Sequence, residues 1–117
     1  MSQRKATILE QKIIANKAML TLQIDSDIAD FEGHFPGYPL LAGVTQLDWA
    51  VFYGKKLLNA GHHFSGMEVI KFQDPILPGD IVLLTLIWHA DKQKLQFSYT
   101  SETNQYSSGR IKLTVKE

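Results

Sequence analysis

Apolar and polar residues alternate along several short segments of the chain, which is the pattern of a β-strand with one buried face. Turn-forming residues such as Pro78-Gly79-Asp80 separate these segments. Residues 81–88 are instead apolar almost throughout, which predicts a central strand covered on both faces. The other expected strands are residues 6–14, 20–24, 67–73, 94–100 and 110–116.

Residues 44–58 show a different pattern, because they contain no proline and carry apolar side chains on nearly every side. A helix of this kind has to be buried, and Gly61 is expected to cap its C-terminal end. A helix of about 15 residues is roughly 22 Å long, which matches the length of a short strand. We therefore expect an α+β domain in which a curved antiparallel sheet of about five to six strands wraps one long central helix. The edges of such a sheet favour a dimer with a continuous sheet.

The loop before this helix is rich in glycine and proline around one histidine, His34. Proline fixes φ and glycine admits unusual backbone angles, so the loop is expected to hold a defined shape. Asp48 follows fourteen residues after His34, in the middle of the apolar helix. A buried carboxylate is costly without a partner, and His34 is the candidate partner that the loop supplies. The glycines and prolines of the loop are Gly33, Pro36, Gly37, Pro39 and Gly43.

Composition narrows the classes of protein that fit this pattern. The 117 residues predict a single domain, 1–117, and the 12 basic and 12 acidic side chains balance to a formal charge of zero. Nothing in this balance indicates a nucleic-acid-binding surface or a polybasic membrane signal. The absence of cysteine excludes disulfides, thiolate chemistry and zinc–cysteine sites. The N-terminal residues lack the apolar core of a signal peptide, so we expect a soluble, cytoplasmic protein.

The loop and helix resemble the signature of a known family, the hot-dog-fold 3-hydroxyacyl-[acyl carrier protein] dehydratases, or thioester dehydrases. The resemblance rests on HFPGYP at residues 34–39, followed by Gly43-Val44 and Asp48. A second motif, Lys71-Phe72 followed by Pro75 and Pro78-Gly79-Asp80, resembles another characteristic segment of the same family. Two positions depart from the family pattern, since Ala42 stands where proline is usual and Phe52 where glutamine is usual.

This resemblance implies a homodimer that can assemble further, with two active sites at the dimer interface and no metal or redox cofactor. His34 would be the base, Asp48 the acid from the other subunit, and the Gly43 N–H the donor to the thioester oxygen. The remaining substrate-binding residues would be Phe35, Pro36, Gly37 and Val44. The partner would be an acyl carrier protein that carries a 3-hydroxyacyl group, in fatty acid synthesis or in a secondary pathway such as aryl-polyene synthesis. An aspartate at position 48 resembles the branch that also isomerises the new double bond.

The residue types suit this dehydration. Histidine is a good general base at neutral pH, and the apolar Phe35 and Pro36 would favour the neutral form of His34. Amides at a helix N-terminus can hydrogen-bond an enolate-like oxygen, and Gly43 would let the thioester carbonyl approach them. Burial on the helix is expected to raise the pKa of Asp48, which favours its role as the acid.

Two other functions stay open. A hot-dog acyl thioesterase would add water to the same thioester, but it would leave the HFPG loop unexplained. A non-catalytic acyl-binding partner subunit would have no need of the intact His34 and Asp48. The product that forms from a 3-hydroxyacyl thioester, enoyl group or free thiol, separates the two enzymes.

Several further residues have ordinary structural interpretations. His62-His63 is expected in a solvated loop rather than a metal site, and His89 in packing beside Trp88. Tyr38 and Tyr53 fit either a substrate tunnel or the core. Cations gathered at the mouth of the site would form a dock for an acidic carrier protein, and otherwise they are solvated side chains. The cations concerned are Lys55, Lys56, Lys71, Arg110 and Lys112.

Overall fold

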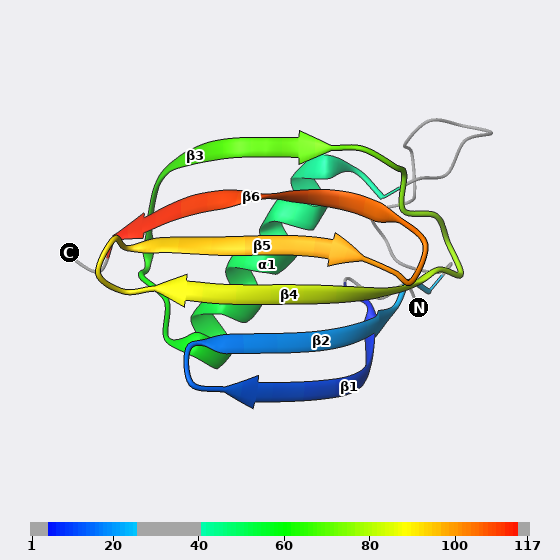
Figure 1. The fold of residues 1–117 in the computed structure, drawn as a ribbon, viewed down its shortest axis with the longest axis horizontal. Coiled ribbons are helices and arrows are strands. Elements are labelled where there is room, and N and C mark those ends of the chain that lie inside the picture. Colours follow the sequence, from blue (N-terminus) through cyan, green and yellow to red (C-terminus); the bar gives the residue numbers. More distant parts are fainter. Residues whose placement is uncertain (1–4, 26–40, 115–117) are drawn as a thin grey trace.

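A single antiparallel sheet curves around one helix in the computed structural model of the protein (Figure 1). The structure describes residues 5–25 and 41–114. In chain order, its elements are β1 (Thr7–Ile14), β2 (Lys17–Gln23), α1 (Gly43–Leu58), β3 (His63–Phe72), β4 (Ile81–His89), β5 (Lys94–Thr100) and β6 (Gln105–Thr114). The six strands are ordered β1-β2-β4-β5-β6-β3 across the sheet, and neighbouring strands are antiparallel.

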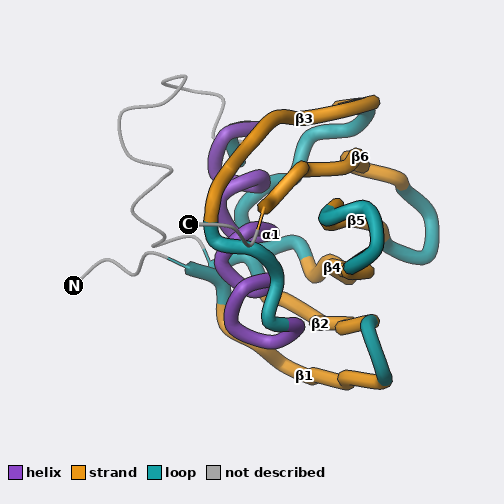
Figure 2. Tube along the Cα trace, turned by 90° about the vertical axis from the view of Figure 1, so that its left-hand side faces the viewer, coloured by secondary structure: helices purple, strands orange, loops and turns teal. Residues whose placement is uncertain are grey.

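Helix α1 lies on the concave face of the sheet, and Figure 2 shows the strands curving around it. Trp49, Ala50 and Tyr53 of α1 are buried in one core with the inward-facing residues of β2, β4 and β5. Gly54 lets the helix approach β5, because a methyl group at Gly54 would lie 2.5 Å from Leu95 Cδ2. The arrangement confirms the predicted hot-dog fold, a long helix wrapped by a curved antiparallel sheet. No helix in the described part of the chain is long and apolar enough to cross a membrane.

The ends of α1 differ slightly from the prediction. The helix begins at Gly43, one residue earlier than expected, and Ala42 occupies the N-cap without a side-chain hydrogen bond. At the other end, Asn59 takes the left-handed conformation with φ 56°, so the prediction of Gly61 as the cap was wrong. Asparagine tolerates this conformation better than most residues, which explains why the cap lies two residues before Gly61, while the helix itself ends at Leu58 as predicted.

Strands β3 and β6 both begin before their predicted starts at residues 67 and 110. The first residues of β6 show no apolar alternation, but they pair with β5, as Ser107 does with Tyr99. Gly109 of β6 also permits close packing, because a methyl group there would collide with the side chain of Ile70. Pairing with distant segments therefore extends both strands beyond their local patterns.

Strand β4 is central in the sheet, as predicted. The prediction that it is buried on both faces was wrong. Its residues alternate between buried and partly exposed rather than being buried throughout. Val82, Leu84 and Leu86 face the core, whereas Leu83 and Ile87 are half-buried on the outer face. The described part of the chain has a helix on one face of the sheet only, so the outer face of β4 has no second layer.

Candidate active site

The N-terminal end of α1 forms the floor of an open pocket of about 410 Å³. The pocket is lined by Leu41, Gly43, Gln46, Phe72, Gln73, Asp74 and Pro75. The Thr45 amide already donates to the Ala42 carbonyl at 3.1 Å, but an amide at the very start of a helix, such as that of Gly43, has no intrahelical acceptor and lies at the positive end of the helix dipole. The pocket thus places Gly43, the predicted oxyanion donor, where a carbonyl oxygen can approach the helix.

Phe72, the last residue of β3, packs directly against Gly43. A methyl group at Gly43 would lie 2.7 Å from the Phe72 Cζ atom and 2.9 Å from Cε1, closer than real side-chain contacts allow. Glycine is therefore needed here for the approach of β3 to the helix start, as well as for the approach of a ligand. The aromatic ring also supplies an apolar wall beside the amide.

Gln46 joins the start of α1 to the sheet through a buried hydrogen-bond network. Its side chain is 3% exposed, donates from Nε2 to the Leu41 carbonyl oxygen at 3.1 Å, and accepts from Ser107 Oγ at 2.5 Å. The hydroxyl of Tyr99 donates to the main-chain carbonyl of Gln46 at 2.7 Å. Burial, and then the nearby Tyr53 and Asp48, raise the pKa of Tyr99 well above its usual range, so the hydroxyl stays a donor.

The sequence pattern did not reveal this network. The one hint of it in the sequence is that Gln46 is a polar residue inside an apolar helix, where a buried amide needs hydrogen-bond partners. Tyr99 was expected only as an alternating residue of a strand. Ser107 lies outside every predicted strand, and its position beside Gln46 follows from the pairing of β6.

Asp48 is exposed in the single chain, so the expectation of a buried carboxylate is not met. Val44, Asp48 and Phe52 are spaced four residues apart, about one helical turn each. All three are exposed, so they form an outward-facing stripe of α1. Val44 is 71% and Phe52 39% exposed, so the apolar helix is not buried on every side. The physical reason is that one curved sheet can cover only one side of the helix.

The other predicted site residues lie outside the described residues. These are His34, Phe35, Pro36 and Gly37, and Tyr38 lies there as well. Their roles, including the partnership of His34 with Asp48, therefore stay predictions. Tyr53, which was expected in a tunnel or in the core, is 4% exposed and belongs to the core.

The remaining histidines divide into three cases. His62 is exposed in the connection after α1, and His63 is exposed but opens β3, so only His62 is in a loop. Within residues 5–25 and 41–114, no group of three histidine or carboxylate side chains could hold a metal ion. His89 is half-exposed beside Trp88, and its Nε2 also lies 3.1 Å from Gln96 Oε1, so its role in packing stays a prediction.

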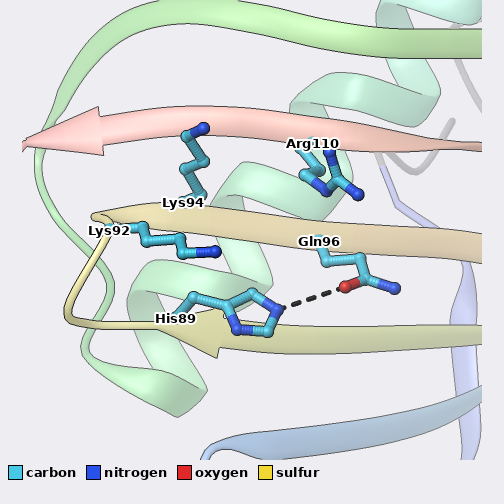
Figure 3. Close-up of a pocket in the computed structure, with 5 residues that line it drawn as sticks. All are labelled: His89, Lys92, Lys94, Gln96 and Arg110. Atoms are coloured by element: carbon cyan, nitrogen blue, oxygen red, sulfur yellow. Dashed lines mark hydrogen bonds between the residues drawn. The ribbon is translucent and has the colours of Figure 1, made fainter.

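Among the residues that the structure describes, no lysine or arginine lines the pocket at Gly43, and Asp74 is a charged residue of its wall. A ring of cations at the pocket mouth is thus not found among the lining residues. Arg110 instead lines another pocket, on the outer face of the sheet (Figure 3).

Comparison with known proteins identifies a dehydratase family. A family model described as ApeI dehydratase, of the ApeI-like type, matches residues 10–110. A chain of the dehydratase heterocomplex ApeI:P from Xenorhabdus doucetiae is 39% identical with a TM-score of 0.88, covering 94% of this chain and 98% of that chain. An uncharacterized protein from Erwinia carotovora subsp. atroseptica is 46% identical with a TM-score of 0.78, covering 97% of both chains.

Curated relatives carry the name 3-hydroxyacyl-[acyl-carrier-protein] dehydratase FabZ. The protein from Polynucleobacter necessarius is 30% identical over 69 residues, which are 53% of this chain and 46% of that protein. The protein from Fusobacterium nucleatum is 28% identical over 101 residues, which are 82% of this chain and 66% of that protein. This chain spans about half the length of most of the curated relatives that it matches.

Proposed function

Since the chain belongs to the ApeI-like dehydratase family, we propose that it is a 3-hydroxyacyl-[acyl carrier protein] dehydratase that forms trans-2-enoyl thioesters. The observation that carries this proposal is the pocket whose floor is Gly43 at the start of α1. It offers helix amides to a thioester oxygen, and an apolar wall at Phe72 to an acyl chain. Asp48 stands just beyond the first turn of the same helix.

In the proposed reaction, His34 removes a proton from C2 of the substrate, and negative charge develops on the thioester oxygen. The Gly43 amide donates a hydrogen bond to that oxygen, which stabilises the charge at a prearranged site. The C3–O bond then breaks, and Asp48 protonates the departing hydroxyl to give water. The proton held by His34 returns to Asp48 through solvent, so the enzyme is unchanged after each turnover. Each positioned acid or base of this kind contributes about 10²–10⁴-fold.

A homodimer is part of the proposal, because apolar residues are exposed on surfaces of the described chain that a second subunit could cover, and two of these surfaces lie near the proposed site. One is the stripe of α1 that carries Val44, Asp48 and Phe52. The other is the edge strand β3, whose Met67 and Val69 are 51% and 60% exposed. Pairing of β3 with a second β3 would continue the sheet and remove this edge. A second subunit over the helix stripe would also shield Asp48 and bring a second His34 loop to it.

The Xenorhabdus doucetiae relative was solved as a dehydratase heterocomplex, so a related second chain is the other candidate partner for these surfaces. For the substrate, we propose a carrier-bound 3-hydroxyacyl group in fatty acid or polyene-type synthesis, handled in the cytoplasm. Mass determination of the purified protein in solution separates a homodimer from a chain that needs a different partner.

Incubation of the purified protein with a 3-hydroxyacyl thioester tests the reaction. We expect absorbance of the conjugated enoyl thioester without release of free thiol. Release of thiol instead would indicate a thioesterase. No reaction by a stable homodimer, with carrier-bound and simple thioesters alike, would indicate a non-catalytic subunit.

A further inference from the structure

A pocket on the outer face of the sheet gathers basic side chains from four segments of the chain (Figure 3). We call it the basic pocket, and its volume is about 200 Å³. It is lined by His89 of β4, Lys92 of the following turn, Lys94 and Gln96 of β5, and Arg110 of β6. Figure 3 shows these side chains in front of the sheet, with α1 behind it. The sheet therefore separates the basic pocket from Gly43.

Strand register forces these charges together. Lys94 lies directly opposite Lys112 on β6 and opposite His89 on β4, which forms a row without a carboxylate. Like charges directly opposite each other in a sheet are destabilising. In the next row, Arg110 lies opposite Gln96, and its other neighbour is Glu68 of β3.

Few carboxylates offset this charge. Glu68 forms a 3.0 Å ion pair with Lys94, and Asp91 precedes Lys92 in the turn. The hydrogen bond from Lys94, followed by the charges of Lys94, Arg110 and Lys112, lowers the pKa of Glu68. No carboxylate among the described residues lines the basic pocket itself, although the whole chain has a formal charge of zero. The positive charge is thus concentrated at this place.

We propose that the basic pocket binds a small soluble anion that carries one or two phosphate groups. The fork of an arginine such as Arg110 matches phosphate oxygens in a bidentate manner, and lysines add point charges around it. Ordinary ligand pockets hold about 300–1,000 Å³, so a pocket of this size suits a diphosphate better than a large metabolite. In residues 5–25 and 41–114, no large apolar side chain lines it, whereas a membrane-surface site would need apolar side chains to insert.

Calorimetric titration of the full chain with sodium pyrophosphate tests the proposal. At about 0.15 M salt, we expect saturable binding of one anion per chain with a Kd below about 1 mM. Arg110→Gln should weaken binding by about tenfold, because it removes charged hydrogen bonds. Lys92→Gln changes an exposed turn and disturbs no strand, so it should weaken pyrophosphate binding several-fold without loss of the fold. It replaces Arg110→Gln as the test if that variant fails to fold. Glu68→Gln should leave binding equal or tighter, since it removes the competing carboxylate.

Lys12→Gln is the matched control, because Lys12 is an exposed cation on β1, two strands away from β4. It should change the Kd by less than about twofold, as expected for a screened distant charge. Equal weakening of pyrophosphate binding by Lys12→Gln and Arg110→Gln would overturn the proposal, and so would titration heats that do not saturate. Either result would mean that pyrophosphate binds as an adventitious ion only. Binding of an acidic protein surface without any binding of pyrophosphate would also overturn it. Dehydration by Arg110→Gln should match the unaltered protein, so this test is independent of the proposed function.

Discussion

The hydroxyl of Tyr99 donates a 2.7 Å hydrogen bond to the main-chain carbonyl of Gln46, which joins strand β5 to the first turns of α1. The Gln46 side chain adds two further connections, to the Leu41 carbonyl and to Ser107 of β6. Gly43 lies between Leu41 and Gln46 in the chain, so this network, anchored on the sheet through Gln46, holds the backbone on both sides of the predicted oxyanion donor. Substitutions of the strand residues that bond to Gln46 should therefore alter the backbone at the start of α1.

Ser107→Ala removes the donor to Gln46 Oε1 and leaves a buried amide oxygen without that partner. We expect the free energy of unfolding to fall by about 1–3 kcal/mol, measured by urea denaturation. Ser108→Ala is the control, because Ser108 is the next residue of β6 and is only half-buried. Similar losses in the two variants would show that the bond from Ser107 adds nothing specific.

Gly43→Ala places a methyl group against the ring of Phe72. We expect a loss of about 1–3 kcal/mol in stability from this overpacking, together with slower turnover. The double variant Gly43→Ala/Phe72→Ala should recover most of the stability that Gly43→Ala lost, because the ring is gone. Thermal or urea denaturation of the two single variants and the double variant measures the coupling. Strictly additive losses would mean that Phe72 is not the reason for glycine at this position.

Asp48→Asn keeps the size of the side chain but cannot deliver a proton to the departing hydroxyl. We expect dehydration to fall by about 10²-fold or more, measured by enoyl absorbance. Deuterium from solvent should still enter C2 of the bound substrate, because that exchange needs only His34 and the Gly43 amide. Asp48→Glu should keep partial activity, since it retains a carboxyl group. Normal dehydration by Asp48→Asn would assign the acid to another group.

Sharing of the site between subunits can be tested by mixing two inactive homodimers, His34→Ala and Asp48→Ala. If His34 of one subunit works with Asp48 of the other, subunit exchange creates one intact site in each mixed dimer. Activity should then return toward half that of the unaltered dimer per mixed dimer. Mass spectrometry confirms the exchange, and confirmed exchange without activity would place both residues in one subunit or end their partnership.

Local sequence was sufficient to predict the main elements of this protein. The proline-free apolar run at 44–58 became α1, and the strict alternation at 94–100 matches β5 within its bounds. Both signals act within one segment, because helix formation and the two faces of a strand depend on neighbouring residues. The register of His34, Gly43 and Asp48 likewise pointed to the family from the sequence alone.

Tertiary structure decided the features that depend on distant partners. Strand β6 begins at Gln105 because its backbone pairs with β5, although its first residues show no apolar pattern. Asp48 is exposed because the sheet covers only one side of α1, which no count of apolar residues reveals. Ser107 reaches Gln46 across 61 residues of chain, and Lys94 faces Lys112 only through strand register. Such contacts are set by the packing of whole elements, so they carry no signal in the local order of residues.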